Sequence, residues 1–80
     1  MTPARKEPNM ETYSGRFAAR LRELRTKANL TQGELSEALG VKQQTVSQWE
    51  TASRSPSIDQ LPAIVKALHL TKVGELMPDE

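Results

Sequence analysis

A run of polar side chains between Lys42 and Gln48 is the part of this sequence most suited to binding chemistry. Gln43, Gln44 and Gln48 carry amides, and each amide holds a hydrogen-bond donor and an acceptor side by side. Such an amide can pair with N6 and N7 of adenine in the major groove of DNA. The run therefore has the chemistry to read base edges, provided that the fold turns it outward.

Residues suited to catalysis, metal binding or disulfide formation are few. His69 is the single histidine, and the chain has no cysteine. A disulfide framework and a thiolate zinc site are therefore excluded. His69 also stands without a second metal ligand or base. We expect no enzymatic activity, no metal and no cofactor.

The 80 residues carry a net charge of +1, but the positive charge is concentrated in one segment. Between residues 14 and 30, five basic side chains stand against one acidic side chain, which gives +4. The basic residues are Arg16, Arg20, Arg22, Arg25 and Lys27, and the acidic one is Glu23. If the fold turns these groups to one side, they favour a polyanionic partner. Arg20 is a candidate phosphate contact.

Helical periodicity begins after the first dozen residues. One apolar stripe with three- and four-residue spacing predicts a helix over residues 15–28. Its members are Phe17, Leu21, Leu24 and Ala28. Ser14 is the expected N-cap and Asn29 the expected stop. Thr31 and Glu34 then have the spacing of a capping box at the start of a second helix.

The second and third helices are predicted to form a tight pair. Gly40 suits the left-handed turn that ends the second helix, whose buried face holds Leu35 and Leu39 with Ala38 beside them. A third helix over residues 43–51 directs Val46 and Trp49 inward, which leaves the glutamines outside. Two helices crossing at about 90–120° need a tight turn and a small contact residue. Gly40 supplies the turn, and Ser36 supplies the small side chain, with its hydroxyl bonded to a carbonyl one turn back.

Two more helices are predicted toward the end of the chain. Ser57 and Gln60 repeat the capping-box spacing, so a fourth helix starts near residue 58, or at 62 because of Pro62. Thr71 is the expected cap of a short fifth helix. The predicted fold is an all-α, compact bundle of five short helices. The expected domains are a flexible N-terminal tail (1–13), a helix-turn-helix domain (14–77) and a C-terminal tail (78–80).

Residues 21–76 resemble the Cro/repressor-type, or Xre-like, helix-turn-helix family, whose members bind operator DNA. The residues that carry the resemblance are Leu30-Thr31-Gln32, Glu34-Leu35, Ala38-Leu39-Gly40-Val41, Val46-Ser47, Trp49-Glu50, Arg54, Pro56 and Ala67-Leu68. The segment from Gly40 to Gln48 is particularly similar to the recognition helices of lambdoid phage repressors. The resemblance implies a lambda-repressor-like DNA-binding domain.

The resemblance also implies roles for individual residues. In the family, glutamines at the positions of Gln43, Gln44 and Gln48 approach base edges. The glutamine at the start of the second helix, here Gln32, binds a phosphate. The family pattern also pairs Arg25 with Glu50. The expected DNA contacts are Gln32, Lys42, Gln43, Gln44, Thr45, Ser47, Gln48 and Arg54. Three positions depart from the family pattern: Lys42 replaces the usual capping Ser or Thr, and Ala52 and His69 replace glycines.

The sequence thus predicts a sequence-specific regulator of transcription that binds double-stranded DNA. We expect a cytoplasmic repressor that binds a palindromic operator as a homodimer, with Val73, Leu76 and Met77 in the dimer surface and no role at a membrane. One alternative is an antitoxin that also binds a toxin partner, using Met10 and Tyr13 of the tail. Another is a protein-interaction module that has lost DNA binding.

Overall fold

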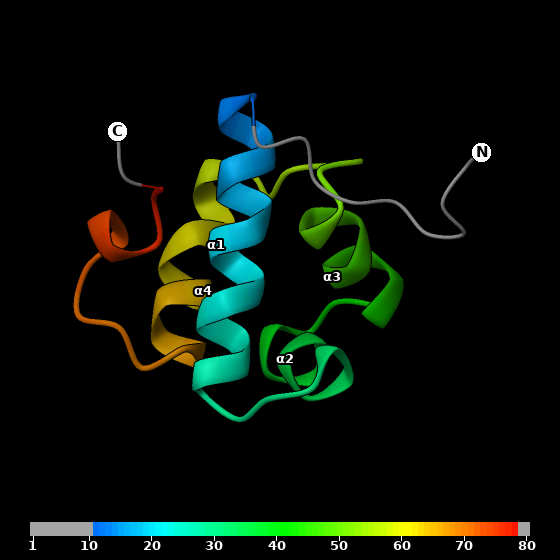
Figure 1. The fold of residues 1–80 in the computed structure, drawn as a ribbon. Coiled ribbons are helices and arrows are strands. Elements are labelled where there is room, and N and C mark those ends of the chain that lie inside the picture. The colour runs from blue at the N-terminus through cyan, green and yellow to red at the C-terminus, as the bar shows by residue number, and fades with distance from the viewer. Residues whose placement is uncertain (1–10, 79–80) are drawn as a thin grey trace.

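The computed structural model describes residues 11–78, and these residues form a helical bundle that contains no strand (Figure 1). Residues 11–78 contain four α-helices: α1 (Tyr13–Lys27), α2 (Gln32–Leu39), α3 (Gln43–Glu50) and α4 (Leu61–Ala67). Two single turns of 3-10 helix, η1 (Ile58–Gln60) and η2 (Val73–Glu75), flank α4. The predicted all-α class is confirmed. Residues 1–10 of the predicted tail, and residues 79–80, lie outside the described residues.

The prediction of five helices is wrong, because the last one is only the turn η2. Gly74 occupies the middle of this turn and Pro78 follows it closely, and both residues oppose extension of a helix. Thr71 does not cap it. Instead, the Glu75 carboxylate accepts hydrogen bonds from the Thr71 backbone N–H at 2.7 Å and the Thr71 hydroxyl at 3.0 Å. These bonds, the backbone one first, hold the pKa of Glu75 below its usual value.

The ends of the other helices follow local capping chemistry. α1 begins at Tyr13, two residues earlier than expected, because Thr12 rather than Ser14 caps it by accepting from the Gly15 N–H at 2.9 Å. The capping box of Thr31 and Glu34 is confirmed at the start of α2. Before α4, the Gln60 side chain accepts from the Ser57 N–H at 2.8 Å. The segment therefore starts at Ile58 as a 3-10 turn, and the α-helix proper begins at Leu61, next to Pro62.

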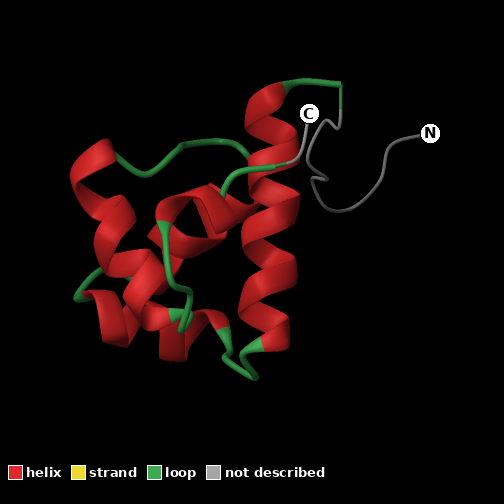
Figure 2. Cartoon of the chain, turned by 90° about the vertical axis from the view of Figure 1, so that its left-hand side faces the viewer, coloured by secondary structure: helices red, strands yellow, loops and turns green. Residues whose placement is uncertain are grey.

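The core lies between α1 and the shorter helices, which pack along one side of it (Figure 2). α1 contributes Phe17, Leu21 and Leu24 to it. The other helices and the last turn add Leu35, Val46, Trp49, Ile64, Val65, Leu68 and Leu76. Ala38, predicted to lie beside the buried face of α2, is instead exposed. Leu76 is fully buried, so the C-terminal segment closes the core rather than presenting this side chain to a partner.

A buried ion pair joins the end of α3 to α1. The Arg25 guanidinium donates to both oxygens of the Glu50 carboxylate, through Nε at 2.6 Å and through Nη2 at 3.1 Å. Its Nη1 donates to the Leu30 carbonyl at 2.7 Å. Glu50 is only 3% exposed. The predicted pair is therefore confirmed, and it also fixes the loop between α1 and α2.

Three non-glycine residues adopt left-handed backbone conformations where helices end. They are Asn29 (φ 61°), Ala52 (φ 66°) and His69 (φ 61°). Ala52 and His69 are the two positions where the family pattern has glycine. The left-handed geometry is thus retained after α3 and α4 although a Cβ atom is present. Such a residue carries steric strain of roughly 1–2 kcal/mol.

We expect Ala52→Gly to raise the free energy of unfolding by about 0.5–1 kcal/mol, because relief of strain exceeds the entropy that glycine gains in the unfolded chain. Urea denaturation monitored by circular dichroism measures this change. Ala38→Gly is the matched control, since Ala38 is exposed within α2 and glycine there costs about 1 kcal/mol. A loss of stability for Ala52→Gly similar to that of the control would contradict the strain argument.

Candidate nucleic-acid interface

The position of α3 on the bundle is fixed by its own buried side and by the turn before it. Val46 is fully buried and Trp49 is 3% exposed, so this side of α3 packs on the core. Gly40 has the left-handed φ of 72° that turns the chain out of α2. The buried Ser36 hydroxyl donates to the Gly33 carbonyl at 2.7 Å, as predicted. The opposite side of α3 is therefore held outward on a rigid base.

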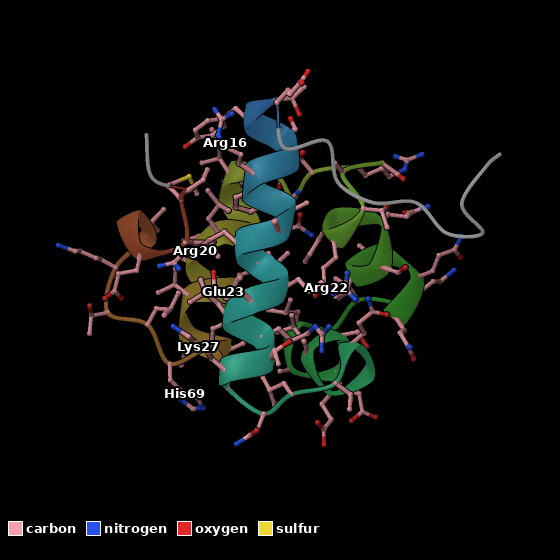
Figure 3. All side chains as sticks on the ribbon, viewed as in Figure 1. Arg16, Arg20, Arg22, Glu23, Lys27 and His69 are labelled. Carbon is pink, nitrogen blue, oxygen red and sulfur yellow. The ribbon has the colours of Figure 1, made fainter. Side chains whose placement is uncertain are left out.

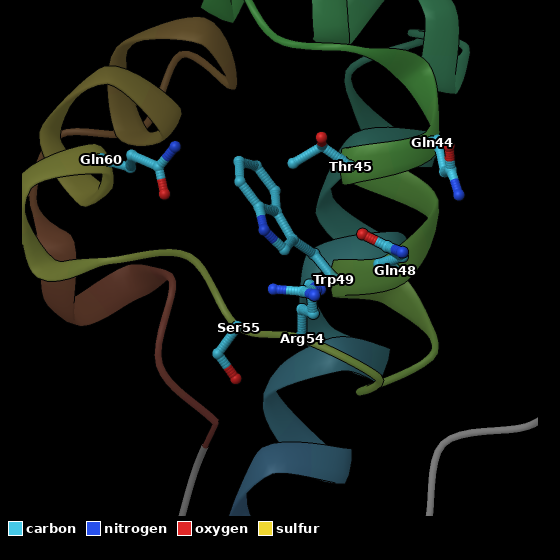
Figure 4. A pocket seen from close by; sticks show the side chains of 7 residues that line it. All are labelled: Gln44, Thr45, Gln48, Trp49, Arg54, Ser55 and Gln60. Atoms are coloured by element: carbon cyan, nitrogen blue, oxygen red, sulfur yellow. The ribbon is translucent and has the colours of Figure 1, made fainter.

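The polar side chains of the predicted run lie on this outward side. Lys42, Gln43 and Gln44 are exposed, and Thr45, Ser47 and Gln48 are half-buried. In Figure 4, Gln44 extends from α3 on the side away from α4, and Gln48 lies on the side of α3 that faces the viewer. Lys42 is the N-cap residue of α3, but its side chain makes no capping hydrogen bond. The first backbone N–H groups of α3 therefore have no side-chain cap from Lys42. The start of a helix favours an anion.

The two adjacent glutamines have different surroundings. A Cβ atom added to Gly33 would lie 3.3 Å from Oε1 of Gln43, so the Gln43 amide folds back toward the start of α2. The Gln44 side chain makes no hydrogen bond with any described residue. It is therefore the better placed of the two to enter a groove of DNA.

Gln32, the predicted phosphate ligand, has an internal partner as well. Its Nε2 donates to Oε1 of Glu50 at 3.1 Å, so the side chain is tied to the buried ion pair. Nε2 carries a second hydrogen that this bond does not use. The capping box bonds the N–H groups of Thr31 and Glu34, while those of Gln32 and Gly33 have no acceptor within α2. Unpaired N–H donors at the start of a helix favour an anion.

A polar groove of about 560 Å³ lies between α3 and the segment that leads to α4 (Figure 4). Arg54, the predicted contact in the loop after α3, lines this groove. The other lining residues are Gln44, Thr45, Gln48, Trp49, Ser55 and Gln60. Sequence reasoning assigned no role to Ser55 and Gln60, and it placed Trp49 in the core. The N–H group of a buried indole usually has a hydrogen-bond partner, and this property marks Trp49 as a candidate contact.

The basic residues of α1 do not form one patch beside α3. Arg16, Arg20 and Lys27 lie along one side of the helix (Figure 3), and Arg20 Nε donates to the Glu75 carbonyl of η2 at 3.3 Å. Arg20 Nη1 also pairs with Glu23 at 3.3 Å. Arg22 lies on the side of α1 on which α3 packs (Figure 3). Arg25 is on that side too, but its guanidinium is paired with Glu50. The candidate phosphate contact Arg20 therefore lies away from the outward face of α3.

Among residues 11–78, no group of three histidine, cysteine, aspartate or glutamate side chains is placed to hold a metal ion. Within the same residues, no helix has both the length and the apolar character needed to cross a membrane.

These features define a helix-turn-helix protein, and comparison with known families agrees. Residues 21–76 match the helix-turn-helix family model, so the chain belongs to this family. The resemblance stated from the sequence is confirmed.

Among curated proteins, the chain is 38% identical over 64 residues to the HTH-type transcriptional activator BcrR of Enterococcus faecalis. The match covers 80% of this chain and 31% of that protein, so the chain spans about a third of its length. Among solved structures, this chain is similar to the restriction-modification controller protein C.AhdI from Aeromonas hydrophila, with a TM-score of 0.72 and 32% sequence identity. That match covers 78% of this chain and 92% of the C.AhdI chain. It is also similar to the P22 c2 repressor protein in complex with synthetic operator 9T, with a TM-score of 0.69 and 31% identity over 76% and 91% of the two chains.

Proposed function

We propose that this chain is a sequence-specific regulator of transcription that binds double-stranded DNA and inserts α3 into the major groove. The observation that carries the proposal is the outward face of α3. Gln44 is exposed and has no partner among the described residues, on a helix whose opposite side is locked into the core. A glutamine in this setting can pair with adenine. The P22 c2 repressor, solved with a synthetic operator, supports DNA as the ligand.

The other expected contacts supply phosphate binding around this helix. Gln32 and the start of α2 provide N–H donors on one side of α3, and Arg54 provides a cation on the other. Lys42, Gln43, Thr45, Ser47 and Gln48 lie between them. We propose that α2 crosses the backbone with its N-terminus toward a phosphate while α3 reads bases.

We further propose that the regulator acts as a homodimer on a palindromic operator and represses transcription. Regulators of this type place two recognition helices about one turn of DNA apart, so protein symmetry is mirrored in the site. Repression requires only that the bound dimer blocks other proteins from the promoter. Of the residues first considered for the dimer surface, Leu76 is buried, whereas Val73 is 37% exposed. Ile58, at 82% exposed, is a stronger candidate for contact with a second copy.

Selection of bound duplexes from a random pool tests the proposal. We expect an enriched sequence with two inverted half-sites whose centres lie about 10 base pairs apart. Enrichment without symmetry would contradict the dimer, and no enrichment at low salt would contradict DNA binding itself and favour a protein-interaction module. A reporter gene controlled by the selected site then distinguishes repression from activation. We propose a cytoplasmic location, because a regulator that binds DNA must share a compartment with it.

The antitoxin alternative rests on the tail. Met10 lies outside the described residues, and Tyr13 begins α1 with the Arg16 guanidinium 5.8 Å from the centre of its ring. Within the described residues, we find no feature that favours a toxin over DNA as partner. Co-purification of a second protein encoded beside this one would favour the antitoxin.

Lys42→Ser should change stability and DNA binding in opposite directions. Serine can cap α3, and a cation at this position opposes the helix dipole, so we expect a gain of about 1 kcal/mol in the free energy of unfolding. DNA affinity should fall, and the slope of log K against log salt should become shallower by about 0.9, as for the loss of one phosphate contact. Lys72→Ser is the matched control, because Lys72 is exposed beside η2. An unchanged salt slope for Lys42→Ser would remove Lys42 from the phosphate contacts.

A further inference from the structure

The groove between α3 and the segment leading to α4 contains an unusual donor. Trp49 is 3% exposed, and its ring packs on the core. Its indole N–H makes no hydrogen bond with any residue between 11 and 78. Because no fully buried side-chain nitrogen in these residues lacks a partner, the indole nitrogen must reach the surface. It does so in the groove, where Figure 4 shows the nitrogen edge of the ring turned toward the loop that carries Arg54 and Ser55.

The surrounding side chains are also donors. Oε1 of Gln60 already accepts from the Ser57 N–H at 2.8 Å and from its hydroxyl at 3.3 Å, so the amide left for the groove is the NH₂ group. The Arg54 guanidinium has no carboxylate partner among the described residues, and Arg54 is exposed. Ser55 adds a hydroxyl, and no acidic side chain lines the groove. A site with one cation, several N–H donors and no carboxylate suits an oxyanion.

We propose that this groove binds one backbone phosphate of DNA, with the Trp49 indole N–H as a direct hydrogen-bond donor and Arg54 as the neutralising cation. The proposal rests on the proposed function and assigns Trp49 two roles, since the six-membered ring anchors α3 in the core while the N–H contacts the ligand. The phosphate would lie beside Gln44 and Gln48, which line the same groove. The contact would therefore fix how deeply α3 enters the major groove.

The two donors predict different signatures in a salt titration with the selected operator. Trp49→Phe removes a neutral donor, so affinity should fall about 10-fold with no change in the slope of log K against log salt. Arg54→Gln removes a charge, so affinity should fall and the slope of log K against log salt should become shallower by about 0.9. Replacing Trp49 with 3-benzothienylalanine, in which sulfur replaces the N–H, keeps the size of the ring. It should reproduce the loss of affinity with an unchanged thermal unfolding midpoint, which separates loss of the donor from loss of packing.

A scan of the operator with single methylphosphonates identifies the phosphate. One substitution in each half-site should weaken binding of the wild-type protein by about 10-fold or more. The same substitution should weaken binding of both Trp49 variants less, because they lose only the Arg54 contact there, while substitutions elsewhere affect all proteins equally. Trp49 is the only tryptophan, so its fluorescence should also change when the operator binds. Inorganic phosphate at millimolar concentration should not reproduce this change if the ligand is the DNA backbone; if it does, a free anion is the ligand and the proposal is overturned.

Two failures remain distinguishable. If the wild-type protein binds no duplex, the proposed function and the phosphate site fail together. If the wild-type protein binds an operator but both Trp49 variants bind it equally well, or no methylphosphonate shows coupling to residue 49, only the indole contact is wrong.

Discussion

Glu50→Gln is expected to lower the free energy of unfolding by about 3–5 kcal/mol, the range for breaking one side of a buried ion pair. The Glu50 carboxylate is 3% exposed and accepts from three donors, two on Arg25 and one on Gln32. The glutamine has nearly the same shape, but its NH₂ group would face donors in place of an acceptor. The Arg25 side chain, only 14% exposed, would keep a charge without a counterion.

The matched control is Glu23→Gln, the same chemical change in an exposed pair. Glu23 lies 3.3 Å from Arg20 with its side chain 54% exposed, so we expect a loss of at most about 1 kcal/mol. Urea denaturation measures the free energy of unfolding of both variants. The experiment is done at low temperature so that the Glu50 variant stays folded, because a domain of this size has only about 5–10 kcal/mol of stability. Equal effects of the two substitutions would show that burial adds little to the Arg25–Glu50 pair.

Gln44→Ala is expected to reduce operator affinity by about 1–3 kcal/mol and to relax the preference at one base pair. Gln44 is exposed on the outward face of α3, so its removal should leave the fold and its stability unchanged. The loss should disappear on an operator in which the contacted base pair is replaced, since the wild-type protein then loses the same pairing. Binding of both proteins to the full set of single-base operator variants measures this coupling.

Gln43→Ala is the matched control for direct readout. It removes the same side chain one position earlier, where the amide folds back toward Gly33. Any change in preference should therefore fall at a different base pair or be absent. If Gln44→Ala weakens binding equally to every operator variant, Gln44 contacts the backbone and does not read sequence.

Local features of this protein were predictable from the order of its residues. The capping box of Thr31 and Glu34, the left-handed turn at Gly40 and the bond of the Ser36 hydroxyl to the preceding turn all follow from spacings of three or four residues. The inward direction of Val46 and Trp49 follows from the same periodicity. The outward direction of Gln43 and Gln44 then follows too. The error at Thr71 was also local, because Gly74 leaves too few good helix formers for more than one turn.

Other features depended on how the helices pack against one another. The sequence alone determined an all-α chain with a helix-turn-helix pair and a polar outer face, since hydrogen bonds and side-chain periodicity within a helix involve near neighbours. Only the tertiary structure joined Gln32 to Glu50, turned Arg20 toward η2, buried Leu76 and opened the Trp49 indole to a groove. Gln32 and Glu50, like Arg20 and Glu75, lie far apart in the chain. Their distances are set by the crossing of helices around one core, which no local spacing encodes.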